Sequence, residues 1–432
     1  MNTVVQRFPE QGDFNRAARI EMAERIFADI RKLSEDGPGV SRESYGPGEQ
    51  AAIDYCAELA GAEELTVRFD EAANLIIEHA GKDPDAPCIV CGSHLDSVPQ
   101  GGNFDGAAGV IAGLIALIRM KRANITPSRT IRLMALRGEE SAWFGQCYLG
   151  SSALFGQLSK DDLDLEHRAT GKTLGDYMGE AGADVERIRN GDRLLDPADI
   201  AAYIELHIEQ GPVMVARNFP VGVVTGLRGN IRHANIVCTG EAGHSGAVPR
   251  WLRHDAVMAT VDLLSKIDGH WQALLERGLD LVVTAGMVNT NPEEHAMSRI
   301  PGECKFCLEI RSQSVDTLEA FYQLMRSEAD NVGRERGVKF DFDRRKLSDP
   351  AVMDKGWIKH LLDTCKDLNI AAEPIPSGAG HDAAVFANRD IPSAMIFIRN
   401  ENGSHNPHEA MEPDDFMHGA DALYSALLDP PL

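Results

Sequence analysis

The spacing of apolar residues along the first third of the chain alternates between a helical and a strand-like period. Apolar side chains recur every three or four residues from Phe14 to Leu33 and from Gly106 to Lys121, which predicts helices there. Short apolar runs between these segments predict strands. Leu65–Phe69, Asn74–His79, Cys88–Gly92 and Thr130–Ala135 are the predicted strands, and a further helix is expected from about Gly48 to Leu59. This alternation indicates an α/β fold whose mainly parallel sheet is covered by helices on both faces.

The pattern changes in the middle of the chain. Strands are predicted at Arg232–Thr239, Leu281–Val288, Cys304–Arg311 and Val338–Phe342, and helices at Asp255–Leu275 and Val315–Arg336. The resulting β-α-β-β-α-β order is typical of a ferredoxin-like antiparallel sheet with helices on one face. A helix at Lys355–Leu368 and a strand at Ser393–Ile398 then return to the first pattern. We therefore expect one discontinuous domain over 1–217 and 347–432, with an inserted domain over 218–346.

Composition narrows the classes of partner. The chain has 432 residues, 43% of them hydrophobic, and a formal net charge of −23. A strongly negative surface repels phosphate backbones and anionic lipids, so we expect neither nucleic-acid nor membrane partners. The first fifteen residues lack the features of a secretory signal, and no apolar run approaches the roughly 20 residues that span a bilayer. These features predict a cytoplasmic protein.

The eight cysteines do not suggest a disulfide framework in a chain of this length. Two pairs, Cys88/Cys91 and Cys304/Cys307, have CxxC spacing, but each pair belongs to a predicted strand. Side chains three residues apart in a strand point to opposite faces, so neither pair is expected to bind one metal ion. Small core residues in a reducing compartment are the better interpretation.

The first candidate functional residues follow the end of the predicted strand Cys88–Gly92. His94 and Asp96 follow in the stretch Gly-Ser-His-Leu-Asp-Ser-Val-Pro, where the carboxylate can hold the second ring nitrogen of a metal-bound histidine. A histidine in a loop without metal is the ordinary alternative. Asp105, in Gly-Gly-Asn-Phe-Asp-Gly-Ala-Ala-Gly, precedes a predicted helix and is either its N-cap or a carboxylate bridging two metals. The glycine spacing matches neither a dinucleotide fingerprint nor a P-loop.

Three later motifs also lie at predicted strand ends. Glu139 and Glu140 follow one strand, His207 lies in an apolar run that ends at Gly-Pro, and His405 follows the strand Ser393–Ile398. Each of these residues could instead be an ordinary surface or loop residue without a role in metal binding. The carboxyl ends of strands in such a sheet meet at one crevice, so these side chains are expected to converge. Two histidines, a bridging carboxylate and a carboxylate–histidine pair form a two-metal ligand set.

Taken together, the motifs resemble those of the M20 metallopeptidase superfamily. Within it the chain resembles the hydantoinase/carbamoylase branch, which includes N-carbamoyl-L-amino-acid hydrolases, β-ureidopropionase and allantoate amidohydrolase. The matching motifs are His-x-Asp at 94–96, the glycine-flanked Phe-Asp at 102–106, Glu-Glu at 139–140, His-Ile-Glu-Gln-Gly-Pro at 207–212, Ser-Gly-Ala-Gly-His-Asp-Ala at 377–383 and Ser-His-Asn-Pro at 404–407. The resemblance runs in order over nearly the whole chain.

This resemblance implies a hydrolase of linear C–N amide bonds that uses two divalent metal ions per subunit. Zinc is the first expectation, with manganese, cobalt or nickel as alternatives. His94 and His207 would bind one ion, Glu140 and His405 the other, and Asp105 would bridge both. The inserted domain would be a lid and a dimerisation domain, so a homodimer is expected.

The resemblance also implies roles in catalysis and substrate binding. Glu139 matches the general base, Asp96 the orienting carboxylate, and His244 of the inserted domain the group that stabilises the oxyanion, in related dimers from the partner subunit. Gln210 matches a substrate-binding position, and Arg311 the arginine that pairs with a substrate carboxylate. The implied substrate is small and anionic, most simply an N-carbamoyl-L-amino acid cleaved to an amino acid, CO2 and ammonia. Allantoate, another ureido acid, an N-acyl amino acid or a dipeptide remain open.

Three positions depart from the branch pattern. Ser298 stands where an asparagine is usual, thirteen residues before Arg311, and offers fewer hydrogen bonds to a substrate carboxylate. Trp143 stands where arginine is common, and Arg399 lies near a usually neutral position. Metal and base positions match while these positions differ, which predicts that the chemistry is kept and leaves the substrate open.

Two other classes of protein agree less well with the sequence than a metal-dependent hydrolase does. A metal-stabilised binding protein that has lost catalysis should have lost its base or a ligand, whereas Glu139 and all five ligand positions are present. A serine or cysteine nucleophile is disfavoured because no GxSxG elbow occurs. Cys91 lies near His94 along the chain, but no third group that would orient the histidine is evident.

Overall fold

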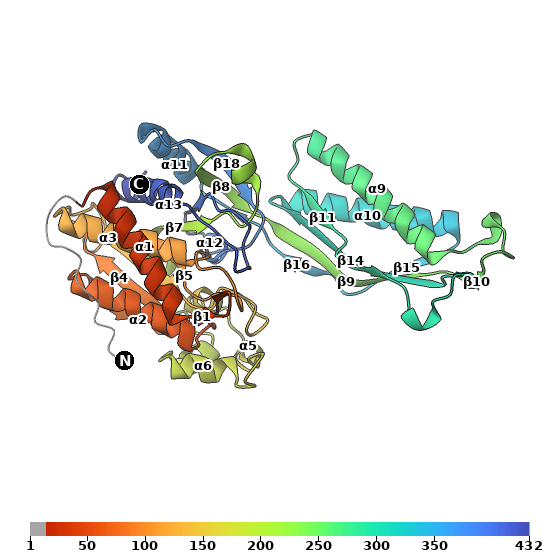
Figure 1. The fold of residues 1–432 in the computed structure, drawn as a ribbon, viewed down its shortest axis with the longest axis horizontal. Coiled ribbons are helices and arrows are strands. Elements are labelled where there is room, and N and C mark those ends of the chain that lie inside the picture. Colours follow the sequence, from red (N-terminus) through yellow and green to blue (C-terminus); the bar gives the residue numbers. More distant parts are fainter. Residues whose placement is uncertain (1–13, 432) are drawn as a thin grey trace. The chain divides into compact units, whose positions relative to one another are not determined.

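A computed structural model describes residues 14–431, which form two compact units. The first unit runs to Thr225 and resumes at Val352, and the second comprises Gly226–Ala351 (Figure 1). The second unit begins later than the expected residue 218 because strand β8 (Val221–Leu227) pairs with β19 (Ser393–Ile398) of the first unit. Among the described residues, no helix is both long and apolar enough to cross a lipid bilayer.

The first unit is built on a nine-stranded mixed sheet of order β17-β8-β19-β7-β5-β6-β4-β3, with β18 also paired to β8. The four central strands β19, β7, β5 and β6 are parallel, whereas β8, β4 and β3 run antiparallel to their neighbours. The remaining strand bounds are β3 Thr66–Phe69, β4 Leu75–His79, β5 Cys88–His94, β6 Ile131–Leu136, β7 Ile200–Ile208, β17 Ala351–Val352 and β18 Ala372–Ser377. The predicted mixed, largely parallel sheet is confirmed.

Helices cover both faces of this sheet, and one face carries the main core. Helix α3 (Ala107–Arg122) is buried along most of its length, which explains why its sequence is apolar all round. The other helices of this core are α1 Arg16–Leu33, α2 Pro47–Ala62, α11 Lys355–Asp367 and α13 Pro413–Leu428. On the opposite face, Phe386 of α12 (Asp382–Ala387) stacks on Tyr203 of β7 at 3.9 Å between ring centroids.

Short elements fill the connections. Between β6 and β7 lie α4 Leu149–Leu154, α5 Lys160–Leu163, α6 Leu174–Glu180 and α7 Val185–Arg189, while β1 Glu35–Asp36, β2 Gly39–Val40 and α8 Val213–Arg217 lie elsewhere in the first unit. None of these elements was predicted from the sequence pattern, because helices of four to seven residues and two-residue strands are too short for a period to emerge.

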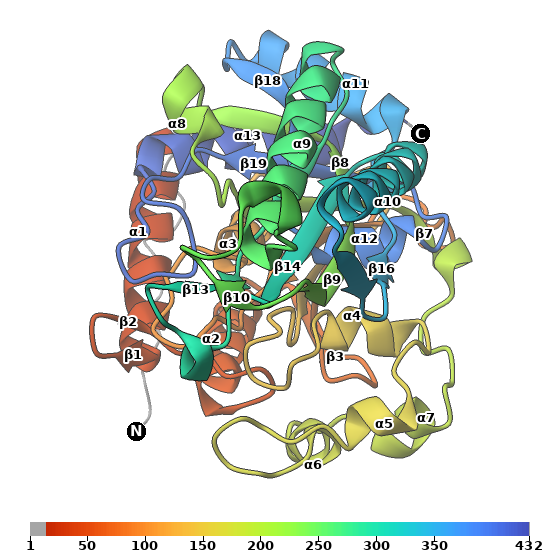
Figure 2. The same cartoon turned by 90° about the vertical axis from the view of Figure 1, so that its right-hand side faces the viewer.

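The second unit has the predicted β-α-β-β-α-β order. Its sheet runs β11-β14-β9-β15, and each of these pairings is antiparallel. Helices α9 and α10 lie side by side and share one apolar core with the sheet (Figure 2). The bounds are β9 Gly229–Thr239, β10 Gly243–His244, α9 Ala256–Glu276, β11 Val282–Thr284, β12 Val288–Asn289, β13 Arg299–Ile300, β14 Glu303–Ser312, α10 Val315–Arg336, β15 Lys339–Phe342 and β16 Lys346–Ser348. The single strand predicted over Leu281–Val288 is divided into β11 and β12, which both pair with β14.

Candidate metal centre

The carboxyl ends of the parallel strands bring the candidate ligands together at one edge of the first unit's sheet. His94 ends β5, His207 lies one residue before the end of β7, and the loops after β6 and β19 carry Glu140 and His405. Three groups of side chains could hold a metal ion, with the ligand atoms of each group within 4.8 Å of one another: His94–Asp105–His207, Asp105–Glu140–His405 and Glu205–His207–His381. The first two contain the five predicted ligands. The predicted convergence of these five residues is therefore observed.

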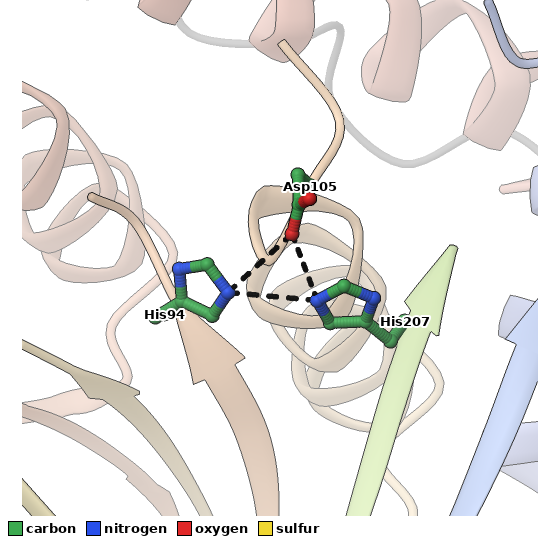
Figure 3. A group of neighbouring side chains, drawn as sticks. All are labelled: His94, Asp105 and His207. Carbon is green, nitrogen blue, oxygen red and sulfur yellow. Dashed lines mark hydrogen bonds and ion pairs between the residues drawn. The ribbon is translucent and has the colours of Figure 1, made fainter. Parts of the chain in front are cut away.

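The first group presents only acceptors to its centre (Figure 3). The Nδ1 atom of His94 lies 3.1 Å from the carbonyl oxygen of Asp96, and that of His207 lies 2.9 Å from the carbonyl oxygen of Ile208. In the neutral form of each ring, Nδ1 therefore donates and Nε2 presents its lone pair toward Asp105 Oδ1, which lies 3.6 Å from His94 Nε2 and 3.0 Å from His207 Nε2. This buried oxygen has no hydrogen-bond partner among residues 14–431. A divalent cation fits this arrangement of facing acceptors.

The electrostatics of the first group favour positive charge. Burial opposes a charged ring, yet Asp105 and Asp96 raise the pKa of His94 well above its ordinary value. The pKa of His207 is also raised, because Asp105 outweighs the effect of burial. Conversely, although burial favours its neutral form, His207 and His94 hold the pKa of Asp105 well below its usual range. A bound metal ion would replace the protons that this cluster otherwise attracts.

The second group is more open. The Nε2 atom of His405 lies 3.1 Å from Glu140 Oε1 and 3.6 Å from Asp105 Oδ2, and the His405 side chain is 51% exposed. A hydrogen bond with Glu140, outweighing burial, raises the pKa of His405 to about 9. Asp105 Oδ2 also accepts hydrogen bonds from Gln210 Nε2 at 2.8 Å and from the Ser404 hydroxyl. The structure thus places the predicted substrate-binding residue Gln210 beside the metal ligands.

Asp96 joins the histidine to the paired glutamates. Its Oδ1 accepts from the backbone N–H of Glu139 and its Oδ2 from that of Glu140, both at 3.1 Å, while Oδ1 also lies 3.2 Å from His94 Nδ1. The hydroxyl of Ser44 donates to Oδ2 at 2.6 Å. One carboxylate therefore holds both the candidate ligand His94 and the loop that carries the two glutamates.

Glu139 lies at the inner side of this cluster. It is 8% exposed and its Oε2 atom lies 4.0 Å from His94 Nε2, so the alternative of a solvated surface residue does not hold. Burial raises the pKa of Glu139 well above its ordinary value, with His94 opposing and Glu140 adding to the shift. A carboxylate with a raised pKa near the metal ligands is suited to accept and return a proton.

Gly106 allows the close approach of the ligands. It has φ +64°, and a Cβ atom there would lie 2.4 Å from the His94 ring. Gly106 is itself the N-cap of α3 and no side chain caps this helix, so the alternative that Asp105 serves as an N-cap does not hold. The glycine pattern in this stretch is thus explained by packing against a metal ligand.

Two buried residues that no sequence pattern indicated hold the ligand loops together. Arg42 is fully buried, and its side chain donates to the Leu95 carbonyl at 2.5 Å and to Asn103 Oδ1 at 3.0 Å. The carboxylate of Glu409 accepts from the backbone N–H groups of Phe104 and Asp105. Both residues contact segments far away in sequence, which leaves no local signal for a prediction.

Two of the departures from the branch pattern have structural explanations. The Trp143 indole N–H donates to the Ser97 carbonyl at 2.7 Å, and its ring stacks on His167 at 5.4 Å between centroids. Arg399 pairs with Asp415 at 2.7 Å and donates to Asn218 Oδ1. Trp143 therefore links the two ligand loops, and Arg399 is engaged in an ion pair away from the metal ligands.

The other predicted substrate residues belong to the second unit. His244, on β10, is exposed, and Ser298 lies in the same corner, since its carbonyl oxygen accepts from Ser245 N–H at 2.8 Å. Arg311 lies near the far end of β14 and pairs with Glu309 at 2.9 Å. Within this unit, His244 and Ser298 are thus neighbours, and Arg311 is separate from them.

Comparison with known proteins places this centre in a family. The sequence profile of peptidase family M20/M25/M40 matches residues 90–429. The chain belongs to this family. Two family relatives cover most of it. An N-carbamoyl-L-amino acid amidohydrolase of Geobacillus stearothermophilus is 33% identical over 406 residues, which are 93% of this chain and 97% of that protein. The allantoate amidohydrolase of Escherichia coli (strain K12) is 31% identical over 387 residues, which are 89% of this chain and 91% of that protein.

The same relationship holds in three dimensions. The crystal structure of a hydantoinase/carbamoylase family amidase from Burkholderia multivorans matches with a TM-score of 0.85 and 26% identity, over 95% of this chain and 97% of that one. The family resemblance seen in the motifs is confirmed. This M20 family member is a hydrolase of the carbamoylase/allantoate amidohydrolase type, which acts on C–N bonds other than peptide bonds.

Proposed function

We propose that this M20 family member hydrolyses the carbamoyl C–N bond of an N-carbamoyl-L-amino acid and releases the amino acid, CO2 and ammonia. One observation carries the proposal. The Asp105 carboxylate lies between the His94–His207 pair on one side and the Glu140–His405 pair on the other. This is the ligand set that a two-metal hydrolase requires, in a chain whose relatives are named amidohydrolases.

Two divalent ions would be held there, one by each pair of residues with Asp105 between them. The mixed nitrogen and carboxylate donors suit zinc first, and also manganese, cobalt or nickel. Such ions, when bound, polarise a carbonyl group and make water more acidic.

The chain's own groups then have defined tasks. Glu139 accepts a proton from the attacking water and delivers it to the leaving nitrogen, while Asp96 keeps His94 and the glutamate loop in place. Gln210 binds the substrate beside Asp105. His244 stabilises the oxyanion, and Arg311, aided by Ser298, binds the carboxylate of a small anionic substrate.

The geometry of the second unit supports a site completed by a second subunit. Beyond the paired ends of β9 and β14, the chain forms the separate antiparallel pair β10–β13, which carries His244 opposite Arg299, whereas Arg311 lies near the other end of β14 (Figure 1). Along β14 alone, the eight steps from Glu303 to Arg311 (311 − 303) span roughly 26 Å at about 3.3 Å per residue, and His244 pairs with Arg299 before that strand begins. One small substrate cannot touch both residues in one subunit, so we propose that His244 and Ser298 come from the partner of a homodimer.

The inserted unit would accordingly serve as both lid and dimerisation domain. It exposes large apolar side chains at the start of α9, which suit burial against a second copy. These are Trp251, which is 80% exposed, with Leu252, Met258 and Val261. The proposal includes no nucleic-acid or membrane partner, in line with the net charge of −23.

A cysteine nucleophile is a poor alternative. Cys91 is buried in β5, and burial raises the pKa of its thiol to about 12, so it has no reactive thiolate near neutral pH. All eight cysteines lie within the described residues and are unpaired, which fits the reducing compartment expected for a cytoplasmic enzyme.

The test is ammonia release by chelator-treated protein to which zinc, manganese, cobalt or nickel is added back. The substrate panel contains N-carbamoyl-L-amino acids, their D-enantiomers, allantoate and N-acetyl amino acids. Metal-restored ammonia release from N-carbamoyl-L-amino acids supports the proposal. Release from allantoate alone assigns the chain to the ureido-acid side of the branch, and cleavage of N-acetyl substrates without ammonia assigns it to the deacylases.

A further inference from the structure

Glu409 is a buried carboxylate that touches two ligand loops at once. It is 7% exposed, and its Oε1 accepts from the backbone N–H groups of Phe104 at 2.7 Å and Asp105 at 3.2 Å. Its Oε2 lies 2.9 Å from the Ser404 hydroxyl oxygen, which is also within hydrogen-bonding distance of Asp105 Oδ2. Phe104 and Asp105 belong to the loop before α3, and Ser404 precedes His405 in the loop after β19. One side chain therefore joins the loop of the bridging carboxylate to the loop of the last histidine.

The surroundings of Glu409 are shaped to its side chain. A Cβ atom at Gly102 would lie 2.2 Å from its carboxyl carbon, so only glycine allows the backbone to close over it. The base of the His405 loop is fixed separately by the two backbone hydrogen bonds between Glu401 and Ala410. The upper part of this loop is tied to the Asp105 loop through Glu409.

The other metal-binding pair has a different support. His94 and His207 lie on β5 and β7, which are adjacent parallel strands in the middle of the sheet. Their positions are set by the strand ladder and by the hydrogen bonds of their Nδ1 atoms. Glu409 makes no hydrogen bond to either histidine. The two candidate metal positions therefore depend on different parts of the fold.

We propose that Glu409 is the positioning residue that fixes the distance between Asp105 and His405 and thereby controls the affinity of the second metal position more strongly than that of the first. This inference rests on the two-metal function proposed above. The carboxyl group accepts from two buried backbone N–H groups, and its removal would leave these groups without an acceptor. The loops would then relax apart, which would change the spacing of Asp105 and His405 at the second position. The first position would keep His94 and His207, which the strands hold, and would be affected only through the shift of Asp105.

The test compares Glu409→Gln and Glu409→Ala with a matched control, Glu401→Gln, in the full-length protein. Glu401 belongs to the same loop but is exposed, and no side-chain hydrogen bond holds it to a ligand loop. Zinc affinities of both positions are measured by competition with a chromophoric chelator, and bound zinc is counted by elemental analysis. Thermal unfolding of the metal-free proteins reports on the fold independently of metal.

The expected result is a different change in zinc affinity at each of the two metal positions. One zinc affinity falls by about 10- to 100-fold in the Glu409 variants, more in the alanine than in the glutamine variant, while the other affinity falls less and both affinities of Glu401→Gln match wild type. Unchanged affinities, or an equal fall of both together with a lower unfolding temperature, would overturn the inference and leave the proposed function standing. A wild-type protein that binds fewer than two zinc ions would overturn the inference together with its two-metal premise. If the Glu409 variants show the expected difference between the two zinc affinities but the wild-type protein releases no ammonia, the inference is supported and the proposed substrate is refuted.

Discussion

At the scale of single residues, Glu139 offers the sharpest test of mechanism. It lies 4.0 Å from His94 Nε2 but belongs to none of the groups of candidate metal ligands. We expect Glu139→Gln to lower the rate of ammonia release by about 10²- to 10⁴-fold, because the amide cannot accept a proton, while bound metal stays at the wild-type level. Steady-state rates and elemental analysis measure the two effects. Activity within tenfold of wild type would show that another group moves the proton.

Alanine variants of two glycines, Gly106 and Gly145, distinguish the effect of backbone strain from the effect of a contact with a candidate metal ligand. Gly106 and Gly145 both have positive φ, +64° and +77°, but only at Gly106 would a Cβ meet the His94 ring, at 2.4 Å. No described atom lies within 4 Å of the Cβ position at Gly145. Both alanine variants should lose about 1 kcal/mol of stability from the left-handed backbone, whereas only Gly106→Ala should lose zinc affinity, by more than about tenfold.

Chelator competition and thermal unfolding of the two variants give the comparison. A loss of zinc affinity in Gly145→Ala equal to that in Gly106→Ala would mean that loop strain, and not the contact with His94, controls the metal position.

The predictability of individual site residues depended on their relation to strand ends. His94, His207 and Glu140 could be assigned because each lies beside an apolar strand whose end was visible in the sequence. Arg42 could not, because its partners Leu95 and Asn103 are 53 and 61 residues away and are brought near only by folding. Residues that bind metal repeat a recognisable chemistry, whereas residues that hold loops in place use ordinary hydrogen bonds.

At the scale of elements, length decided what the sequence could predict. The predicted bounds of α10 and β19 coincide with those observed, because both have sustained apolar patterns and clear ends. The stretch from Leu149 to Arg189 was not predicted, since its four helices have four to seven residues each. The predicted strand Leu281–Val288 is interrupted because β11 and β12 pair with different parts of β14.

The ladder between β9 and β14 leads to a prediction about pH. Glu309 lies directly opposite Arg232 in this ladder and also pairs with Arg311 on its own strand. Although burial opposes the shift, Arg311 and Arg232 lower the pKa of Glu309 below its ordinary value of 4.5. A depressed pKa in the folded state means that the ionised carboxylate stabilises the fold above pH 4.5, and that this contribution is lost as the pH falls through the folded-state value.

Glu309→Gln should therefore reduce stability by about 0.5–1 kcal/mol at pH 7, with a smaller difference at pH 4 and below. Urea unfolding of metal-free protein at both pH values measures this, since proton competition for the metal ligands is then absent. A difference between variant and wild type that is the same at pH 7 and pH 3 would show that the ion pairs contribute nothing and that only packing has changed.

At the scale of the whole molecule, the residues of the function proposed above are divided between the two compact units. The first unit carries the metal ligands, Glu139 and Gln210, and the second carries His244, Ser298 and Arg311. Sequence patterns located these residues within their elements but not relative to one another, because the arrangement of units and subunits is set by surfaces and not by periodicity. The length of strand β14, which separates His244 from Arg311, is the structural argument that one subunit cannot supply both.

Subunit complementation decides whether His244 acts across a dimer. Glu139→Gln and His244→Ala should each be inactive as homodimers, for different reasons. In a heterodimer of the two, purified through a different tag on each subunit, the His244→Ala subunit keeps Glu139 and would receive His244 from its partner. One of the two sites would then be complete, so the heterodimer should have about half of the wild-type activity. If His244 acts within its own subunit, both sites carry a lesion and the heterodimer stays as inactive as its parents, and a monomer in light scattering would exclude the shared site altogether.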